Sequence, residues 1–325
     1  WGVAPGSLPR KGRSAYELLD ALGGEVRSLF VMGSNVAVAA PNLARILPKL
    51  QALELLVVCD AFHNETSEHA HVFLPVYQWA EEDGTVTNLE GRVIRRRAVA
   101  RPPTGPRTDL AVLHALAARL GCGEKFRFGS AEGVFDELRR ATAGAVADYS
   151  GISYAKIERQ GGVFWPCRSE DDPGTPRLFA ERFGHADGRA QFFPVEHRAA
   201  GEEPDAEFPL FFTTGRYKEH YNSGAQTRGV AKLASAQPVP QLELHPRLAR
   251  RHRVAAGSRV TIESRRAKVE FVAAVTPDIR PDTLFAPFHW GGRQAANLLT
   301  GGALDPTSRM PEFKLTAVRI AGVRA

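Results

Sequence analysis

The sequence predicts an α/β domain built on a parallel sheet, followed by a β-rich domain that closes into a barrel. Short apolar runs alternate with helical patterns in the first part of the chain, whereas short β-rich runs dominate from residue 208 onward. The 325 residues are enough for two hydrophobic cores. A content of 43% hydrophobic and 24% charged residues is typical of a globular protein.

Three short apolar runs in the first domain, which is expected over residues 1–160, predict the strands of its sheet. They cover residues 27–32, 55–59 and 71–74. Pro41 and Asn42 begin a predicted helix, because leucine and isoleucine recur at helical spacing over residues 43–50. A short polar helix is expected at residues 65–70. This alternation predicts a parallel sheet covered on both faces, with ligands at the carboxyl ends of its strands.

The remainder of the first domain is expected to be less regular. Residues 81–93 predict an extended excursion with a turn, and Asp109 is expected to cap a helix that continues to Leu120. A second helix is expected near residues 131–141. Residues 161–207 are rich in glycine, proline and charge, which predicts a long linker.

Short β-rich runs in the second domain, which is expected over residues 208–325, predict a closed barrel. These runs cover residues 210–213, 242–244, 259–264, 267–275 and 283–286. The third and fourth runs flank Arg265 and Arg266, so they predict a hairpin.

The basic character of the chain indicates an anionic ligand. The net charge is +6, and basic residues concentrate over residues 92–107 and 247–268. Solvated surface or a subunit contact accounts for such runs, and a phosphate-rich cofactor accounts for the same charge. Aromatic residues do not alternate with the charges, so nucleic-acid binding is not expected. The absence of an apolar run of roughly eighteen residues argues against a membrane-spanning helix.

The three cysteines, Cys59, Cys122 and Cys167, are far apart in the sequence. They are too few for an iron–sulfur cluster held by four thiolates within this chain. Their number and spacing favour a cytoplasmic chain without a disulfide framework. The chain begins at Trp1 with no signal peptide, and this start suggests a fragment, a processed product or an incomplete gene model.

A group of polar residues near one predicted strand end could suggest a zinc site. It consists of His63, Glu65, His69 and His71. The spacing does not match a helical pair of ligands followed by a third ligand, so surface polar residues are the favoured interpretation.

Ordered motifs along the whole chain resemble one family, the oxidoreductases that carry a molybdenum bis-dinucleotide cofactor. In the first domain these are Val31-Met32-Gly33-Ser34-Asn35, Val57-Val58-Cys59-Asp60, Phe73-Leu74-Pro75, Trp79-Ala80-Glu81 and Glu90-Gly91-Arg92-Val93. In the second domain they are Thr213-Thr214-Gly215-Arg216, Ser223-Gly224-Ala225-Gln226-Thr227-Arg228, Phe288-His289-Trp290, Asn297-Leu298-Leu299-Thr300 and Pro311-Glu312-Phe313-Lys314. The motif that begins at Ser223 is most similar to assimilatory nitrate reductases. Val36 stands where the family has proline, and Glu82 stands where it often has a basic residue.

The resemblance implies a Rossmann-like first domain, a barrel of the double-psi type, and Mo-bis(molybdopterin guanine dinucleotide) as the cofactor. Gly-containing turns and planar guanidinium groups suit a pyrophosphate, and Asn35 adds a side-chain amide. For Asp60 and Asp109 a helix cap is the alternative, and for Arg216 a structural contact at a barrel turn. No residue is predicted to be catalytic. The predicted cofactor-binding residues are Gly33, Ser34, Asn35, Cys59, Asp60, Asp109, Thr214, Gly215, Arg216, Tyr217, Glu219, His220, Ser223, Phe288, Asn297 and Lys314.

The activity that the resemblance implies is the reduction of nitrate to nitrite. It places the metal ligand and a 4Fe-4S cluster in an N-terminal part that this chain does not contain, so the chain alone is expected to be inactive. The implied partners are that N-terminal part and an electron-donor protein or domain. Two alternatives are a formate dehydrogenase catalytic subunit and a non-catalytic relative, such as the large iron–sulfur subunit of NADH dehydrogenase.

Overall fold

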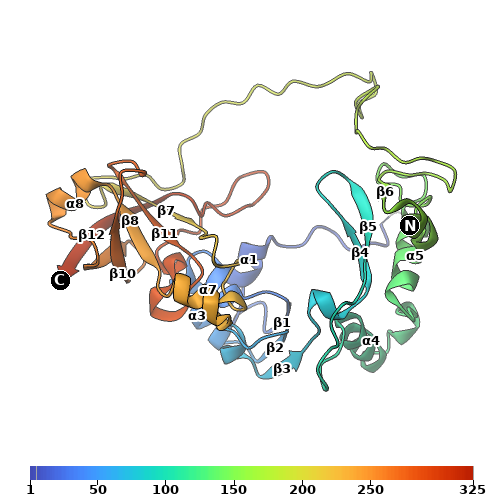
Figure 1. Cartoon of the computed structure of the whole chain (residues 1–325), viewed down its shortest axis with the longest axis horizontal. Coiled ribbons are helices and arrows are strands. Elements are labelled where there is room, and N and C mark those ends of the chain that lie inside the picture. The colour runs from blue at the N-terminus through green and yellow to red at the C-terminus, as the bar shows by residue number, and fades with distance from the viewer. Residues whose placement is uncertain (5, 325) are drawn as a thin grey trace. The chain divides into compact units, whose positions relative to one another are not determined.

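The computed structural model describes residues 1–4 and 6–324, which form two compact units (Figure 1). The barrel unit combines Lys11–Leu74 with His197–Ala325, and the hairpin unit combines Trp1–Arg10 with Pro75–Glu196. Each unit is a group of residues that contact one another. The N-terminal sheet therefore belongs to the same unit as the barrel. The predicted boundaries at residues 160 and 208 divide the chain in sequence order and stay a prediction.

The sheet of the barrel unit has the strand order β1-β2-β3. The strands are β1 (Ser28–Met32), β2 (Leu55–Asp60) and β3 (Val72–Pro75). β1 and β2 are parallel, with Ser28 opposite Leu55 and Met32 opposite Cys59. This register aligns the carboxyl ends of the two strands, and the parallel pairing predicted from the sequence is confirmed.

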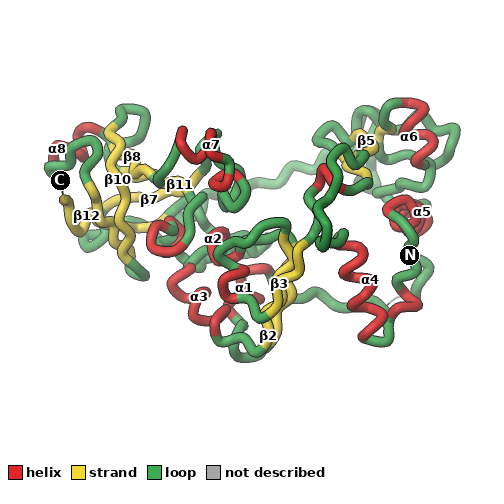
Figure 2. The backbone as a smooth tube through the Cα atoms, turned by 60° about the horizontal axis from the view of Figure 1, so that its bottom comes forward, coloured by secondary structure: helices red, strands yellow, loops and turns green. Residues whose placement is uncertain are grey.

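Three helices pack beside this sheet (Figure 2). They are α1 (Ala15–Asp20), α2 (Val36–Ala39) and α3 (Leu43–Gln51). Leu43, Ile46 and Leu50 of α3 are fully buried in the same core as the β2 side chains. The opposite face is less covered, because Phe30 and Leu55 remain 36% and 41% exposed. The sheet was predicted to be covered on both faces. This prediction is wrong for the face that carries Phe30 and Leu55, because α1, α2 and α3 pack on the opposite face.

The barrel is closed, with the strand order β10-β8-β11-β7-β12-β9. The strands are β7 (Leu210–Gly215), β8 (Gln241–Leu244), β9 (Arg259–Ser264), β10 (Lys268–Val275), β11 (Thr283–Pro287) and β12 (Thr316–Arg324). β9 and β10 form the predicted antiparallel hairpin. Alternate residues such as Phe212, Ile262 and Phe271 point into one buried core. β12, which was not predicted from the sequence, closes the barrel by pairing with both β7 and β9.

Two short helices lie between barrel strands in the sequence (Figure 1): α7 (Ala231–Ala236) precedes β8, and α8 (Pro246–His252) follows it. Pro246 occupies the first turn of α8, where a missing amide hydrogen costs nothing. None of the helices among the described residues is long and apolar enough to cross a membrane.

The hairpin unit contains a small antiparallel sheet and three helices. They are β4 (Gly84–Thr87), β5 (Arg92–Arg96), β6 (Val163–Phe164), α4 (Asp109–Arg119), α5 (Ala131–Thr142) and α6 (Tyr154–Gln160). The side chain of Thr108, not Asp109, caps α4 by accepting a hydrogen bond from the Ala111 amide. The prediction of Asp109 as the cap is wrong by one residue, because Asp109 already lies in the first turn. Residues 165–209, all of them described, contain no helix or strand.

Candidate functional site

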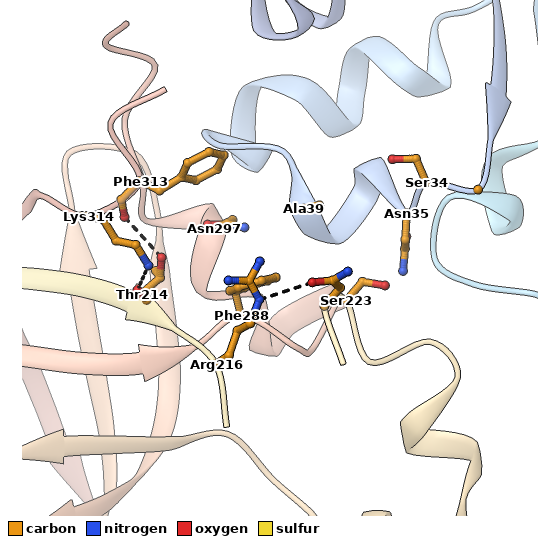
Figure 3. A pocket seen from close by; sticks show the side chains of 12 residues that line it. Ser34, Asn35, Ala39, Thr214, Arg216, Ser223, Phe288, Asn297, Phe313 and Lys314 are labelled. Carbon is orange, nitrogen blue, oxygen red and sulfur yellow. Dashed lines mark hydrogen bonds between the residues drawn. The ribbon is translucent and has the colours of Figure 1, made fainter. Parts of the chain in front are cut away.

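A cavity of about 430 Å³ lies in the barrel unit where the sheet meets the barrel (Figure 3). Many of the predicted cofactor-binding residues line it together. These are Gly33, Ser34, Asn35, Thr214, Arg216, Ser223, Phe288, Asn297 and Lys314. Three lining residues were not predicted: Ala39, Asn222 and Phe313. Asn222 and Phe313 directly precede the predicted residues Ser223 and Lys314, so their sequence proximity could have identified them. No feature of the sequence pointed to Ala39.

The turn after β1 forms one side of the cavity. Gly33 has a positive φ of 57°, a conformation that favours glycine, and its amide donates to the Cys59 carbonyl at 2.9 Å. No heavy atom lies within 4 Å of the position that a Cβ would take on Gly33. The backbone at Gly33 and Ser34 is therefore open to a ligand in the cavity.

The Asn35 side chain is held in place by the protein. Its Nδ2 donates to Glu65 Oε2 at 2.7 Å. Its Oδ1 accepts from the amide and the hydroxyl of Thr66, at 3.2 and 2.8 Å. The side-chain amide of Asn35 was predicted to serve a pyrophosphate. The structure instead engages this amide in internal hydrogen bonds, which fix the turn that carries Gly33 and Ser34.

Two cations from the barrel face the same cavity (Figure 3). The Lys314 ammonium donates to the Thr214 carbonyl, and the Thr214 hydroxyl donates to the Phe313 carbonyl at 3.2 Å. Burial, together with the nearby charge of Arg216, lowers the pKa of Lys314. The lining residues include no carboxylate, so the cavity carries uncompensated positive charge suited to an anion.

Arg216 is oriented by an aromatic ring and an amide. Its guanidinium lies 5.1 Å from the centre of the Phe288 ring, and its Nε donates to Asn222 Oδ1 at 3.3 Å. Arg216 nevertheless remains exposed, so the remaining hydrogens of its planar fork are accessible to a ligand.

Asn297 carries a buried acceptor with no hydrogen-bond partner among the described residues. The residue is 2% exposed, and its Nδ2 donates to the Val38 carbonyl at 2.8 Å. Its Oδ1 is buried and unpartnered. A buried polar atom without a partner is costly, so a ligand N–H or O–H that reaches this oxygen would be stabilised there.

A buried histidine holds the loop between β7 and Ser223. The Tyr217 amide donates to His289 Nε2 at 2.8 Å, and His289 Nδ1 contacts the Asn222 carbonyl. Burial lowers the pKa of His289, which favours the neutral ring. Because Nε2 accepts, the ring proton lies on Nδ1 and is donated to the Asn222 carbonyl. His289 thereby fixes the residue that orients Arg216.

The other predicted residues of this loop do not line the cavity. His220 is buried, with Nδ1 3.1 Å from the Thr227 hydroxyl and Nε2 2.9 Å from the Gln237 carbonyl. Glu219 lies 3.7 Å from the Lys218 ammonium. Gly215 permits a close approach, because a Cβ there would lie 2.5 Å from the Phe285 ring. These contacts shape the loop instead of the cavity surface.

Cys59, Asp60 and Asp109 are also absent from the cavity lining. Cys59 is buried at the end of β2. Asp60 accepts from the Ala61 amide at 2.7 Å and from Asn64 Nδ2 at 2.9 Å, so it organises its own turn. Asp109 belongs to the hairpin unit.

The histidines near β3 make ordinary structural contacts. The His63 ring stacks on Phe73 with 4.0 Å between ring centres, and His71 Nδ1 accepts from the Leu56 amide at 2.9 Å. Among the described residues, no group of three or more His, Cys, Asp or Glu side chains is arranged to hold a metal ion.

Comparisons with known families match both parts of the chain. Residues 3–119 match the family described as molybdopterin oxidoreductase. Residues 210–317 match the molydopterin dinucleotide binding domain.

Known proteins show the same relationship. The chain is 43% identical to the assimilatory nitrate reductase catalytic subunit of Bacillus subtilis, over 98% of this chain and 46% of that protein. It is 36% identical to the F420-dependent formate dehydrogenase subunit alpha of Methanocaldococcus jannaschii, over 96% of this chain and 46% of that protein. The chain thus spans about half the length of these relatives.

A solved structure supports the fold. Acetylene hydratase from Pelobacter acetylenicus superposes with a TM-score of 0.66 at 18% identity, over 93% of this chain and 46% of that chain. The chain therefore belongs to the molybdopterin oxidoreductase family, and its barrel region is a molydopterin dinucleotide binding domain for Mo-bis(molybdopterin guanine dinucleotide).

Proposed function

We propose that this chain is the C-terminal, cofactor-holding part of a molybdenum-dependent nitrate reductase of nitrate assimilation. The observation that carries the proposal is the cavity that Arg216 and Lys314 share without any lining carboxylate. The identity to the Bacillus subtilis nitrate reductase subunit supports nitrate as the substrate. In this proposal the β1–β3 region is the Rossmann-like part, and the barrel is of the double-psi type.

The lining residues fit the polar groups of a guanine dinucleotide. Arg216 and Lys314 would neutralise the pyrophosphate, and the open backbone at Gly33 and Ser34 would donate to its oxygens. The unpartnered Oδ1 of Asn297 would accept from a hydroxyl or ring N–H group. Tyr217, Glu219 and His220 would act through the loop that they shape.

Asp60 and Asp109 are proposed to hold nucleotide groups in the assembled enzyme. The proposal for these two residues rests on the motif resemblance, because neither lines the cavity. Cys59 would contribute through the strand end that it occupies.

When bound, the cofactor would supply the oxygen-atom-transfer chemistry for the proposed reduction of nitrate to nitrite. The chain's own residues hold the dinucleotide tails, orient the cofactor and exclude water from the pyrophosphate. The metal ligand, the 4Fe-4S cluster and the contact with an electron-donor protein or domain are proposed to lie in an N-terminal part of the same enzyme. That part corresponds to the remaining length of the relatives, and without it the chain is expected to be inactive. A cytoplasmic location is proposed because the chain has only three cysteines, which lie far apart in the sequence.

The test compares cofactor content and activity in the enzyme that contains this chain together with its N-terminal part. Wild-type enzyme should contain molybdenum and guanine nucleotide and should oxidise reduced viologen when nitrate is added. Arg216→Gln and Lys314→Gln should lower the nucleotide content, whereas Lys218→Gln should not, since its side chain is 91% exposed. Wild-type enzyme that contains neither molybdenum nor guanine nucleotide would overturn the proposal.

A formate dehydrogenase is the second candidate, because 36% identity relates the chain to the Methanocaldococcus jannaschii subunit. The same enzyme preparation distinguishes the two. Formate-dependent reduction of an oxidised viologen, with no response to nitrate, would favour the second candidate.

A further inference from the structure

Glu65 connects the sheet to the barrel beside the cavity. Its Oε2 accepts from Asn35 Nδ2 at 2.7 Å, and its Oε1 accepts from Arg228 Nη2 at 2.6 Å. Asn35 follows β1, Glu65 follows β2, and Arg228 belongs to the loop after β7. One carboxylate therefore joins three segments that are distant in the sequence.

These contacts lie between two cavities of the barrel unit. Asn35 lines the cavity of about 430 Å³, opposite Arg216 and Lys314. Glu65 and Arg228 line a second cavity of about 440 Å³. The barrel loop contributes to both, through Ser223 in the first cavity and Ala225 in the second. The ion pair thus lines the second cavity and is connected to the first through the hydrogen bond between Glu65 and Asn35.

The surrounding backbone leaves room for both charged side chains. A Cβ on Gly291 would lie 2.6 Å from Cγ of Glu65. Gly224 has a positive φ of 76°, and a Cβ there would lie 2.9 Å from Nε of Arg228. The Arg228 amide also donates to the Gly224 carbonyl at 2.8 Å. Glycine at both positions lets the pair approach the main chain closely.

Partial burial makes this ion pair stronger than an ordinary surface pair. The Glu65 and Arg228 side chains are 17% and 30% exposed. The Arg27–Glu54 pair of the same unit is 70% and 57% exposed, so water screens it more effectively. Removing one partner of a partly buried pair is destabilising, because the other charge then remains partly buried without its hydrogen bond.

We propose that Glu65 is a positioning residue that ties the barrel loop of residues 222–228 to the strand end at Gly33, and thereby retains the dinucleotide. Asn222 and Ser223 of this loop line the cavity, and Asn222 orients Arg216. The inference deepens the proposed function and rests on it. It assigns retention of the cofactor to a carboxylate that lies outside the cavity lining.

The test measures how fast guanine dinucleotide leaves the full enzyme after gel filtration, in Glu65→Gln, Arg228→Gln and the double variant. Each single variant should release it about ten-fold faster or more, since a charge-assisted hydrogen bond is lost. The double variant should be no faster than the faster single variant, because both remove one interaction. Arg228→Lys should recover part of the retention, and the control Glu54→Gln should match wild type.

A second measurement covers variants that assemble poorly. Hydrogen exchange of the amides at residues 222–229, measured on this chain without cofactor, should rise in Glu65→Gln and Arg228→Gln but not in Glu54→Gln. Unchanged release and unchanged exchange in the Glu65 and Arg228 variants would overturn the inference. Wild-type enzyme without any dinucleotide would overturn the proposed function instead, so the two failures are distinguishable.

Discussion

The Tyr217 amide donates to Nε2 of His289 at 2.8 Å, and this bond sets the tautomer of a fully buried histidine. The ring can then donate from Nδ1 to the Asn222 carbonyl. A doubly protonated ring would present a hydrogen to the Tyr217 amide, which is itself a donor. The loop that shapes the candidate site therefore depends on a neutral histidine.

Acid should weaken the fold through His289. Its pKa is lowered by burial, so below about pH 6.5 the unfolded chain binds a proton that the folded chain does not. The free energy of unfolding should fall as pH decreases below that value, by at most about 1.4 kcal/mol per pH unit from this residue. Above about pH 6.5 the contribution of His289 to the free energy of unfolding should be fully retained. Urea unfolding of wild type and His289→Gln between pH 5 and 8 measures the difference.

His252 is the control for this experiment, because burial and the neighbouring Arg251 lower its pKa as well. Its variant His252→Gln should remove a separate part of the pH dependence and leave the His289 part intact. Identical pH slopes in wild type and His289→Gln would contradict the prediction.

Gly224→Ala should destabilise the barrel unit by about 2 kcal/mol or more. Gly224 has a positive φ of 76°, and an added Cβ would lie 2.6 Å from the His289 carbonyl oxygen. Backbone strain and a steric clash therefore act together. Chemical unfolding measures the change in the free energy of unfolding.

Gly257 provides the matched control, since its φ of 84° is similar but nothing lies within 4 Å of the added Cβ. Gly257→Ala should show only the backbone strain, about 1–2 kcal/mol. Equal losses in the two variants would show that the contact with His289 contributes nothing.

The fold could be predicted from the sequence where local patterns were strong. Apolar runs located β1, β2 and β3, and leucine spacing located α3, because both depend on neighbouring residues. β12 was missed, although it closes the barrel. It pairs with β7 and β9, and a bulge between Ile320 and Gly322 interrupts its register. Such long-range pairing leaves little signal in a short window of sequence.

The candidate site shows the same limit. Motif positions identified Arg216 and Lys314, and the structure brings both to one cavity. The sequence could not show that the amide of Asn35 is engaged by Glu65 and Thr66. The sequence also could not show that His289 orients the loop, because the residues of the Tyr217–His289 hydrogen bond lie 72 positions apart in the chain. Side-chain orientation depends on packing between distant segments, which composition and spacing do not encode.

Asn297→Asp should destabilise the barrel unit by about 2 kcal/mol in the absence of cofactor. The substitution keeps the shape but replaces the Nδ2 donor with an oxygen that faces the Val38 carbonyl 2.8 Å away. Thermal unfolding of the purified chain measures the loss. Gln191→Glu makes the same change from amide to carboxylate at an exposed position and should change the stability little. A variant as stable as wild type would show that the Val38 contact is unimportant.

Lys156→Met should destabilise the hairpin unit by about 3 kcal/mol or more. Lys156 is fully buried, and its ammonium donates to the carbonyls of Glu170 and Asp172, each at 2.7 Å. Methionine fills a similar volume but leaves those acceptors without a donor inside the protein. Hydrogen exchange resolved by segment measures the effect, and faster exchange is expected in α6.

The two units make this prediction specific, because Lys156 belongs to the hairpin unit and the barrel strands belong to the other. Exchange in β7 to β12 should stay as in wild type, and Lys125→Met, at an exposed position, should change neither unit. A uniform increase in exchange across both units would mean that the chain unfolds as a single cooperative body. Unchanged exchange in α6 would mean that water replaces the ammonium as the donor to these carbonyls, in which case burial of Lys156 contributes little to stability.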